Sequence, residues 1–164
     1  NTYLPLRLSF VNEAARLVNS SGGNLDDVLK GVGMDTRIGQ HYFRPSPAWG
    51  GSCFPKDVVE VNNFYDADEV NLPLIANIIK SNKIQTQWTA NMLKSIHNEK
   101  KLNGIILVGA AFKEDTDDLR NSPTIDIYDQ LLAKNMNIMM YIYKTNAQYN
   151  CTRSVKDKQN QINR

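Results

Sequence analysis

The chain has 164 residues, a hydrophobic fraction of 41%, a charged fraction of 22% and a formal net charge of +2. These values are typical of a soluble globular protein and exclude a disordered or fibrous chain. A charge this small and dispersed also argues against nucleic acid as a partner. The longest mostly apolar runs are far shorter than the roughly 20 residues of a membrane span, so no membrane partner is expected.

The first half of the chain reads as helices. The spacing predicts one helix over residues 1–20 and a second that begins after Asn24 as N-cap and ends at Gly33. A third is expected after Pro55, and a fourth, long enough to serve as a dimer seam, from Pro73 to about His97. The apolar stripe predicted for the first helix consists of Leu6, Phe10, Ala14, Leu17 and Val18.

Residues 34–55 predict a long loop between these helices. Six glycines and prolines exclude regular structure across the stretch. Its four aromatic residues argue against disorder, because disordered segments are poor in aromatics. A loop of this length that is ordered is usually functional, so we expect it to hold a ligand.

The second half changes to an α/β pattern. A buried strand within residues 104–112 is followed by a polar loop, a helix that starts at Ser122 and Pro123, and a second apolar strand. This order predicts the opening of a parallel sheet, with a domain boundary near residues 98–103. From Lys144 onward the sequence is polar, so either this second domain is incomplete or the tail is disordered.

Cys53 is the residue with the clearest chemical potential. Two glycines precede it and a helix start follows, an arrangement that favours a thiolate, and Asp57 lies one helical turn further on, where it could orient a water. A small buried thiol is the other reading of Cys53, because most free cysteines are of that kind. The residues alone leave both readings open.

Other candidate sites are weaker. A Cys-His hydrolase would need His41, which has no evident orienting partner. Arg37, Arg44 and Lys56 could hold phosphate groups or could be ordinary surface charges. The acidic run from Glu114 to Asp118 lacks the spacing of a calcium loop, and the two cysteines, Cys53 and Cys151, lack zinc-ligand spacing, so we expect no metal.

Four motifs in order resemble the UDP-glucose/GDP-mannose dehydrogenase family over about residues 1–143. They are "MDTRIG", "FRPSPAWGG", "GGSCFPKD" and "GAAFKEDTDDLRNSP". The resemblance implies a mainly α helical dimerisation domain over residues 1–100, followed by an incomplete α/β Rossmann-like nucleotide-binding domain over residues 101–164. After "MYIY" the sequence departs from the family. The family's NAD-binding domain, which precedes these parts, is not in the chain.

The resemblance also implies site residues. Cys53 would be the nucleophile, Asp57 would act on a water, and Asn1 would stabilise an oxyanion, while Arg37 would reach into a partner subunit's sugar site. Residues that match substrate contacts are Arg37, Phe43, Arg44, Pro45, Ser46, Pro47, Ala48, Trp49, Gly50, Phe112 and Lys113. Residues that match NAD contacts are Cys53, Phe54, Pro55, Lys56 and Arg120.

The activity implied is the twofold oxidation of the C6 alcohol of UDP-glucose by NAD, through a thiohemiacetal and a thioester on Cys53, in a cytoplasmic homodimer joined through the central helices. Phe54 favours UDP-glucose over GDP-mannose. An alternative is a non-catalytic dimerisation and nucleotide-sugar-binding module. Without an NAD-binding domain, we expect the 164-residue chain to be inactive alone.

Overall fold

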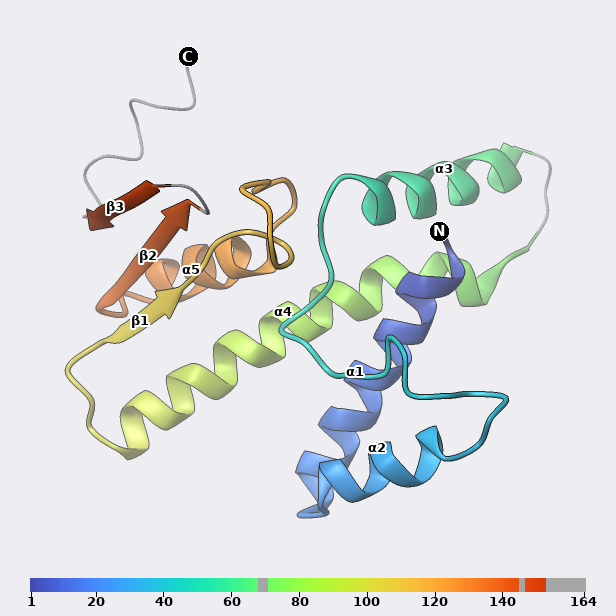
Figure 1. The fold of residues 1–164 in the computed structure, drawn as a ribbon, viewed down its shortest axis with the longest axis horizontal. Coiled ribbons are helices and arrows are strands. Elements are labelled where there is room, and N and C mark those ends of the chain that lie inside the picture. The colour runs from blue at the N-terminus through green and yellow to red at the C-terminus, as the bar shows by residue number, and fades with distance from the viewer. Residues whose placement is uncertain (68–70, 145–146, 153–164) are drawn as a thin grey trace. The chain divides into compact units, whose positions relative to one another are not determined.

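The computed structural model describes residues 1–67, 71–144 and 147–152, which divide into two compact units (Figure 1). The first unit is Asn1–Thr86 and the second begins at Gln87. The first contains α1 (Tyr3–Ser21), α2 (Leu25–Gly33), α3 (Cys53–Ala67) and the first part of α4 (Pro73–Glu99). The second contains the rest of α4, then β1 (Ile105–Val108), α5 (Pro123–Ala133), β2 (Ile138–Lys144) and β3 (Ala147–Thr152).

The first two helices form a hairpin whose ends follow from local chemistry. Gly22 adopts φ 70°, the left-handed conformation that glycine tolerates, and ends α1 there. The side chain of Asn24 accepts hydrogen bonds from the main-chain N–H groups of Asp26 and Asp27, which caps α2. The predicted cap at Asn24 is confirmed.

The face of α1 that packs inward differs from the predicted one. Phe10 and Leu17 are 58% and 70% exposed, whereas Val11, Ala15 and Val18 are buried. The predicted stripe was therefore wrong at Phe10 and Leu17. The inward face also carries polar residues, Ser9 and Asn12, which apolar periodicity does not detect.

The loop between α2 and α3 contains turns but no helix or strand over residues 35–52, as predicted. In Figure 1 it leaves α2, passes α1 and α4 and rises to α3. Helix α3 begins at Cys53, earlier than expected, because Pro55 falls in its first turn, where the missing N–H costs no helical hydrogen bond. The core of this unit is Trp49, Val58 and Ile78.

The second unit has the predicted strand, helix and parallel strand. Ser122 is the N-cap of α5 and Pro123 its first residue, also as predicted. Strands β1 and β2 pair in parallel, with Ile106 opposite Met139. Strand β3, which the polar composition of the tail did not predict, pairs antiparallel with β2. Residues 145–146 and 153–164 of the tail lie outside the described residues.

The core of the second unit lies between the sheet and helices α4 and α5. Its buried members are Ala90, Ala110, Ile127, Tyr128, Leu131, Ile138 and Met140. The opposite face of the sheet carries Ile106 and Val108, which are 65% and 68% exposed among the described residues. The strand pair is thus covered on one face. No helix in the part of the chain that the structure describes is long and apolar enough to cross a membrane.

This asymmetry predicts different costs for two truncations in the second unit. Leu131→Ala, at a side chain with no exposed surface, is expected to lower the free energy of unfolding by about 2–5 kcal/mol, since it leaves a cavity. Ile106→Ala on the open face is expected to cost at most about 1 kcal/mol. Urea denaturation of the two variants measures both values, and equal costs would contradict the described packing.

Candidate active site

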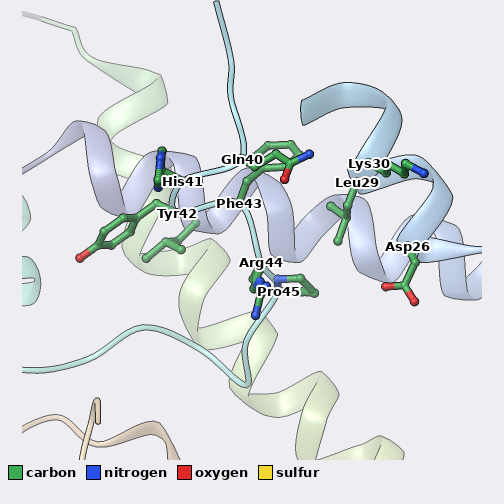
Figure 2. A pocket seen from close by; sticks show the side chains of 10 residues that line it. Asp26, Leu29, Lys30, Gln40, His41, Tyr42, Phe43, Arg44 and Pro45 are labelled. Carbon is green, nitrogen blue, oxygen red and sulfur yellow. The ribbon is translucent and has the colours of Figure 1, made fainter. Parts of the chain in front are cut away.

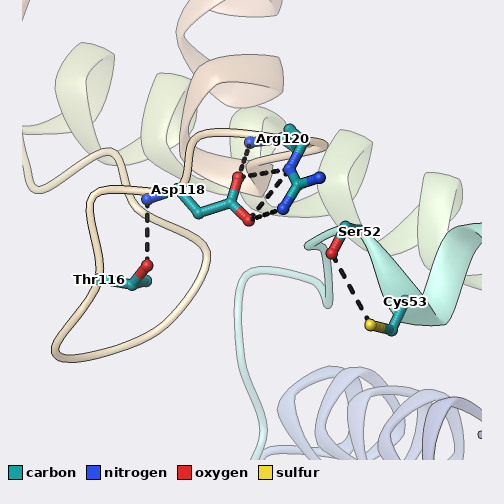
Figure 3. Close-up of polar contacts among 5 residues, drawn as sticks. All are labelled: Ser52, Cys53, Thr116, Asp118 and Arg120. Atoms are coloured by element: carbon teal, nitrogen blue, oxygen red, sulfur yellow. Dashed lines mark hydrogen bonds and ion pairs between the residues drawn. The ribbon is translucent and has the colours of Figure 1, made fainter.

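Cys53 is presented by two buried glycines and the start of a helix. Gly51 adopts φ 90°, a conformation that residues with a side chain rarely take. Cys53 is the first residue of α3 and is exposed, and the Ser52 Oγ lies 3.7 Å from its Sγ (Figure 3). The main-chain N–H groups at a helix N-terminus favour a negative charge. Of the two readings left open by the sequence, the structure contradicts the buried thiol.

Asp57 lies one turn along α3 from Cys53 and is held by two donors. The Asn1 Nδ2 donates to its Oδ2 at 2.6 Å, and the Lys56 Nζ lies 2.9 Å from its Oδ1. The hydrogen bond from Lys56, followed by the one from Asn1, lowers the pKa of Asp57. The same contact with Asp57 raises the pKa of Lys56. The structure thus brings Asn1 and Asp57 together, although 56 positions separate them in the sequence.

The loop predicted to grip a substrate has several side chains that face inward. Phe43, Ala48 and Trp49 are buried, and the guanidinium of Arg7 lies 5.3 Å above the Phe43 ring. Arg44 and Pro47 are exposed, and Pro45 and Ser46 are half-buried. The buried members therefore shape the loop through packing.

The anchors of this loop are residues that sequence reasoning missed. Asn12 accepts from the N–H of Ser46, Gln85 donates to its carbonyl, and Asn82 bonds both main-chain groups of Trp49. One signal could have revealed those on α4. Ile78, Asn82, Gln85 and Thr89 share helical spacing, so polar residues continue an otherwise apolar face. Buried polar side chains on such a face require partners.

Arg37 projects from the loop next to its own counter-ion. The guanidinium Nη2 lies 2.6 Å from Oδ2 of Asp35, and its Nε donates to Oδ1 at 3.0 Å. This pairing lowers the pKa of Asp35 and raises the pKa of Arg37. The Arg37 side chain is nevertheless 87% exposed, so Asp35 orients it while it stays accessible.

A hollow of about 1020 Å³ lies between α2 and the loop (Figure 2). Lys30 and Asp26 come from α2, and Arg44 and Pro45 come from the loop. His41 also lines the hollow, whereas Cys53 does not. The cysteine and the histidine of the hydrolase hypothesis therefore do not share this hollow.

In the second unit, the loop after β1 holds the other predicted residues. Its turn begins at Gly109, whose φ is 84° and whose N–H donates to the carbonyl of Tyr141. The Lys113 Nζ lies 5.5 Å from the centroid of the Phe112 ring, a cation–π contact. Substrate contacts were predicted for both of these side chains.

Asp118 and Arg120 form a bidentate pair in the same loop. The Arg120 Nε and Nη2 donate to the two carboxylate oxygens at 2.9 and 2.7 Å, and the Arg120 N–H donates to Oδ1 (Figure 3). These bonds from Arg120 lower the pKa of Asp118 from 3.8 to about 2. The planar guanidinium is thereby held in one orientation. Among the described residues, no three His, Cys, Asp or Glu side chains gather as metal ligands.

Comparison with known proteins finds two family models along the chain. The model of the UDP-glucose/GDP-mannose dehydrogenase family, central domain, matches residues 1–84, and the UDP binding domain of the same family matches residues 106–161. Together they cover most of the sequence. The family to which the motifs pointed is therefore confirmed.

Individual proteins similar to this chain carry the names of the same family. A UDP-glucose 6-dehydrogenase of Rickettsia felis is 38% identical over 145 residues, which are 86% of this chain and 32% of the relative. A GDP-mannose 6-dehydrogenase of Azotobacter vinelandii is 32% identical over 151 residues, 91% of this chain and 33% of the relative. A UDP-glucose dehydrogenase structure from the archaeon Pyrobaculum islandicum has a TM-score of 0.74 at 30% identity, over 87% of this chain and 32% of that one. The chain spans about a third of the length of these curated relatives.

The pairing of Asp118 with Arg120 predicts how the stability of the folded chain depends on pH. Since the pKa of Asp118 is lowered to about 2 in the folded chain, its contribution to stability is present above the ordinary value of 3.8 and is lost as the pH falls toward 2. Arg120→Ala is expected to return the pKa of Asp118 toward 3.8. Carboxyl ¹³C NMR titration measures it. Lys113→Ala is the control and should move the pKa less, because Lys113 makes the smallest contribution; an unchanged value in Arg120→Ala would contradict the pairing.

Proposed function

The chain belongs to the UDP-glucose/GDP-mannose dehydrogenase family, a family of oxidoreductases, and we propose on this premise that it supplies the cysteine-bearing and nucleotide-binding parts of an NAD-dependent UDP-glucose 6-dehydrogenase. The observation that carries the proposal is the 2.6 Å hydrogen bond from Asn1 to Asp57, one helical turn from the exposed Cys53. Because the chain spans about a third of the length of its relatives, the activity is proposed for the full-length protein.

Cys53 acts in this proposal as a nucleophile. Removal of a hydride and a proton from the C6 alcohol gives an aldehyde, and the Cys53 thiolate adds to its carbonyl carbon, so that a C–S bond forms and the oxygen takes the electron pair. Loss of a second hydride from that carbon gives a thioester. Water then attacks the thioester carbon, the C–S bond breaks, and the uronate leaves while the thiolate is restored.

Asp57 and its two partners suit the hydrolytic step. The hydrogen bonds from Lys56 and Asn1 lower the pKa of Asp57, so it stays a carboxylate at neutral pH and can accept a hydrogen bond that orients the attacking water. The same shift makes it a weaker base. An amide nitrogen carries two N–H groups. Asn1 can therefore donate one to Asp57 and offer the second to the oxygen that becomes negative during attack, which stabilises the transition state.

The chain's cationic side chains fit NAD as the oxidant. Arg120 presents a guanidinium that Asp118 holds in place, a geometry suited to a pyrophosphate oxygen, and Lys56 is exposed beside Cys53. We propose that Arg120, Lys56 and the segment from Cys53 to Pro55 would hold it. NAD, when bound, would accept the hydrides of the oxidation.

The remaining roles follow the family pattern. We propose that residues 1–100 form the dimerisation domain and residues 101–164 a partial Rossmann-like UDP-binding domain, and that the loop from Phe43 to Gly50 contacts the nucleotide sugar together with Phe112 and Lys113. Arg37, which is exposed and oriented by Asp35, would reach the sugar site of a second subunit. GDP-mannose is the alternative substrate, supported by the relative from Azotobacter vinelandii.

The nucleophile is tested by Cys53→Ser in the full-length protein that contains this chain. NAD reduction with UDP-glucose is expected to fall by at least about 1,000-fold, because a serine hydroxyl is not ionised at neutral pH and adds poorly to the aldehyde. Absorbance at 340 nm measures the rate. Cys151→Ser, the same change at the other cysteine, is expected to leave it within about twofold. Equal rates in Cys53→Ser and the parent would refute the mechanism.

Substrate choice is tested by initial rates on both nucleotide sugars. The value of kcat/KM is expected to be at least about tenfold higher for UDP-glucose than for GDP-mannose, which is a difference of about 1.4 kcal/mol in transition-state binding. The reverse order would assign the protein to GDP-mannose. Binding of UDP-glucose by calorimetry without any NAD reduction would instead support the non-catalytic module.

A further inference from the structure

The side-chain amide of Asn82, on α4, hydrogen-bonds both main-chain groups of Trp49. Its Nδ2 donates to the carbonyl oxygen of Trp49 at 2.8 Å, and its Oδ1 accepts from the N–H of the same residue at 3.0 Å. A single side-chain amide thus satisfies both main-chain groups of one residue. Since a buried main-chain group without a partner is costly, this contact determines where the loop passes α4.

The side chain of Trp49 is fixed as firmly as its main chain. The indole Nε1 donates to the Ser9 Oγ at 3.0 Å, and the residue is 7% exposed. The ring packs with Val58 and Ile78 in the core of the first unit. Trp49 is therefore an anchor held from α1, α3 and α4 together.

The segment that presents Cys53 begins and ends at this anchor. Phe54 follows Cys53 directly, and its ring meets the Trp49 ring edge-on, with centroids 6.3 Å apart and planes at 79°. Only Gly50, Gly51 and Ser52 lie between Trp49 and Cys53. Glycines impose few limits on the backbone. The anchors at the two ends of the segment, rather than its own residues, therefore fix its course.

The part of the loop that precedes Trp49 is also held by side-chain hydrogen bonds to its main chain. Asn12 of α1 accepts from the N–H of Ser46 at 2.8 Å, and Gln85 donates to the Ser46 carbonyl at 2.8 Å. Arg16 donates in turn to the Oε1 of Gln85. Three side-chain amides, from Asn12, Asn82 and Gln85, thus bind the main chain of the loop at two points.

We propose that Asn82 is a positioning residue for Cys53. It acts through Trp49: by fixing this anchor, it fixes the place at which α3 begins and the thiol stands. The inference rests on the proposed function, in which Cys53 must meet a carbonyl carbon. Misplacement of a reacting group by about 1 Å can cost about 100-fold in rate, so loss of the anchor is expected to act on kcat.

The test is Asn82→Ala in the full-length protein, assayed with UDP-glucose and NAD. The expected result is a fall in kcat of at least about tenfold with a smaller rise in KM, of about threefold at most. The change frees Trp49, which belongs to the loop proposed to contact the sugar, but its main effect is on the thiol that must reach a carbonyl carbon.

Two controls separate positioning from stability. Asn77→Ala removes an exposed asparagine from the same helix, whose Nδ2 donates to the Pro73 carbonyl of that helix. Val18→Ala weakens the core at the far end of α1, beside Gly23. Both are expected to keep kcat within about twofold of the parent, and Val18→Ala is expected to lower the urea midpoint. If Asn82→Ala does not fold, Asn82→Asp, which keeps the acceptor for the Trp49 N–H, is judged by the same criterion.

The outcomes distinguish a failure of the positioning role of Asn82 from a failure of the proposed function. If the parent is active and Cys53→Ser is not, a kcat of Asn82→Ala within twofold of the parent overturns the positioning role, as does an equal loss in Val18→Ala. If the parent reduces no NAD with either sugar, the proposed function fails. The positioning role is then tested without activity, by the rate at which iodoacetamide alkylates Cys53, followed by mass spectrometry. A change in this rate of at least fivefold in Asn82→Ala, but not in Val18→Ala, supports the positioning role. A smaller change in Asn82→Ala overturns it.

Discussion

A loop that runs through the interior of a protein must find hydrogen-bond partners for its own main chain, and the segment before Cys53 finds them in side-chain amides. Asn12, Asn82 and Gln85 supply donors and acceptors that a strand would have obtained from a neighbouring strand. The loop can therefore be buried without regular structure. The conformation of the segment before Cys53 depends on these hydrogen bonds from side-chain amides, because the glycines before the cysteine have no preferred backbone conformation of their own.

The same requirement explains the composition of the helices that surround the loop. Helices α1 and α4 place Ser9, Asn12 and Gln85 on inward faces where apolar residues would pack more simply. Phe10 and Leu17 remain on the outside of α1. Helices α1 and α4 thus give up part of their apolar faces to polar residues that anchor the loop, and the large apolar residues that remain exposed on α1 do not indicate its buried side.

Several charged groups follow a second pattern, in which a predicted site residue has a hydrogen-bonding or oppositely charged partner close by. Lys56 and Asn1 hold Asp57, Asp35 orients Arg37, and Asp118 orients Arg120. These pairs are mostly exposed, so they add little to stability. Their effect is on orientation and charge state, since each lowers the pKa of the carboxyl group that takes part. A catalytic or binding site needs such control more than it needs stability.

The sequence by itself determined what local rules decide. The cap at Asn24, the helix start at Ser122 and Pro123, the long helix α4 and the parallel pair of β1 and β2 depend on neighbours within a few positions or on an apolar run. The motif around Cys53 identified the family for the same reason, because its residues are contiguous. Only the tertiary structure decided that Asn1 meets Asp57, that Asn82 grips Trp49 and that the inward face of α1 includes Asn12. These contacts join residues 33 to 56 positions apart, and no periodicity within one element reports which distant main chain a polar side chain will meet.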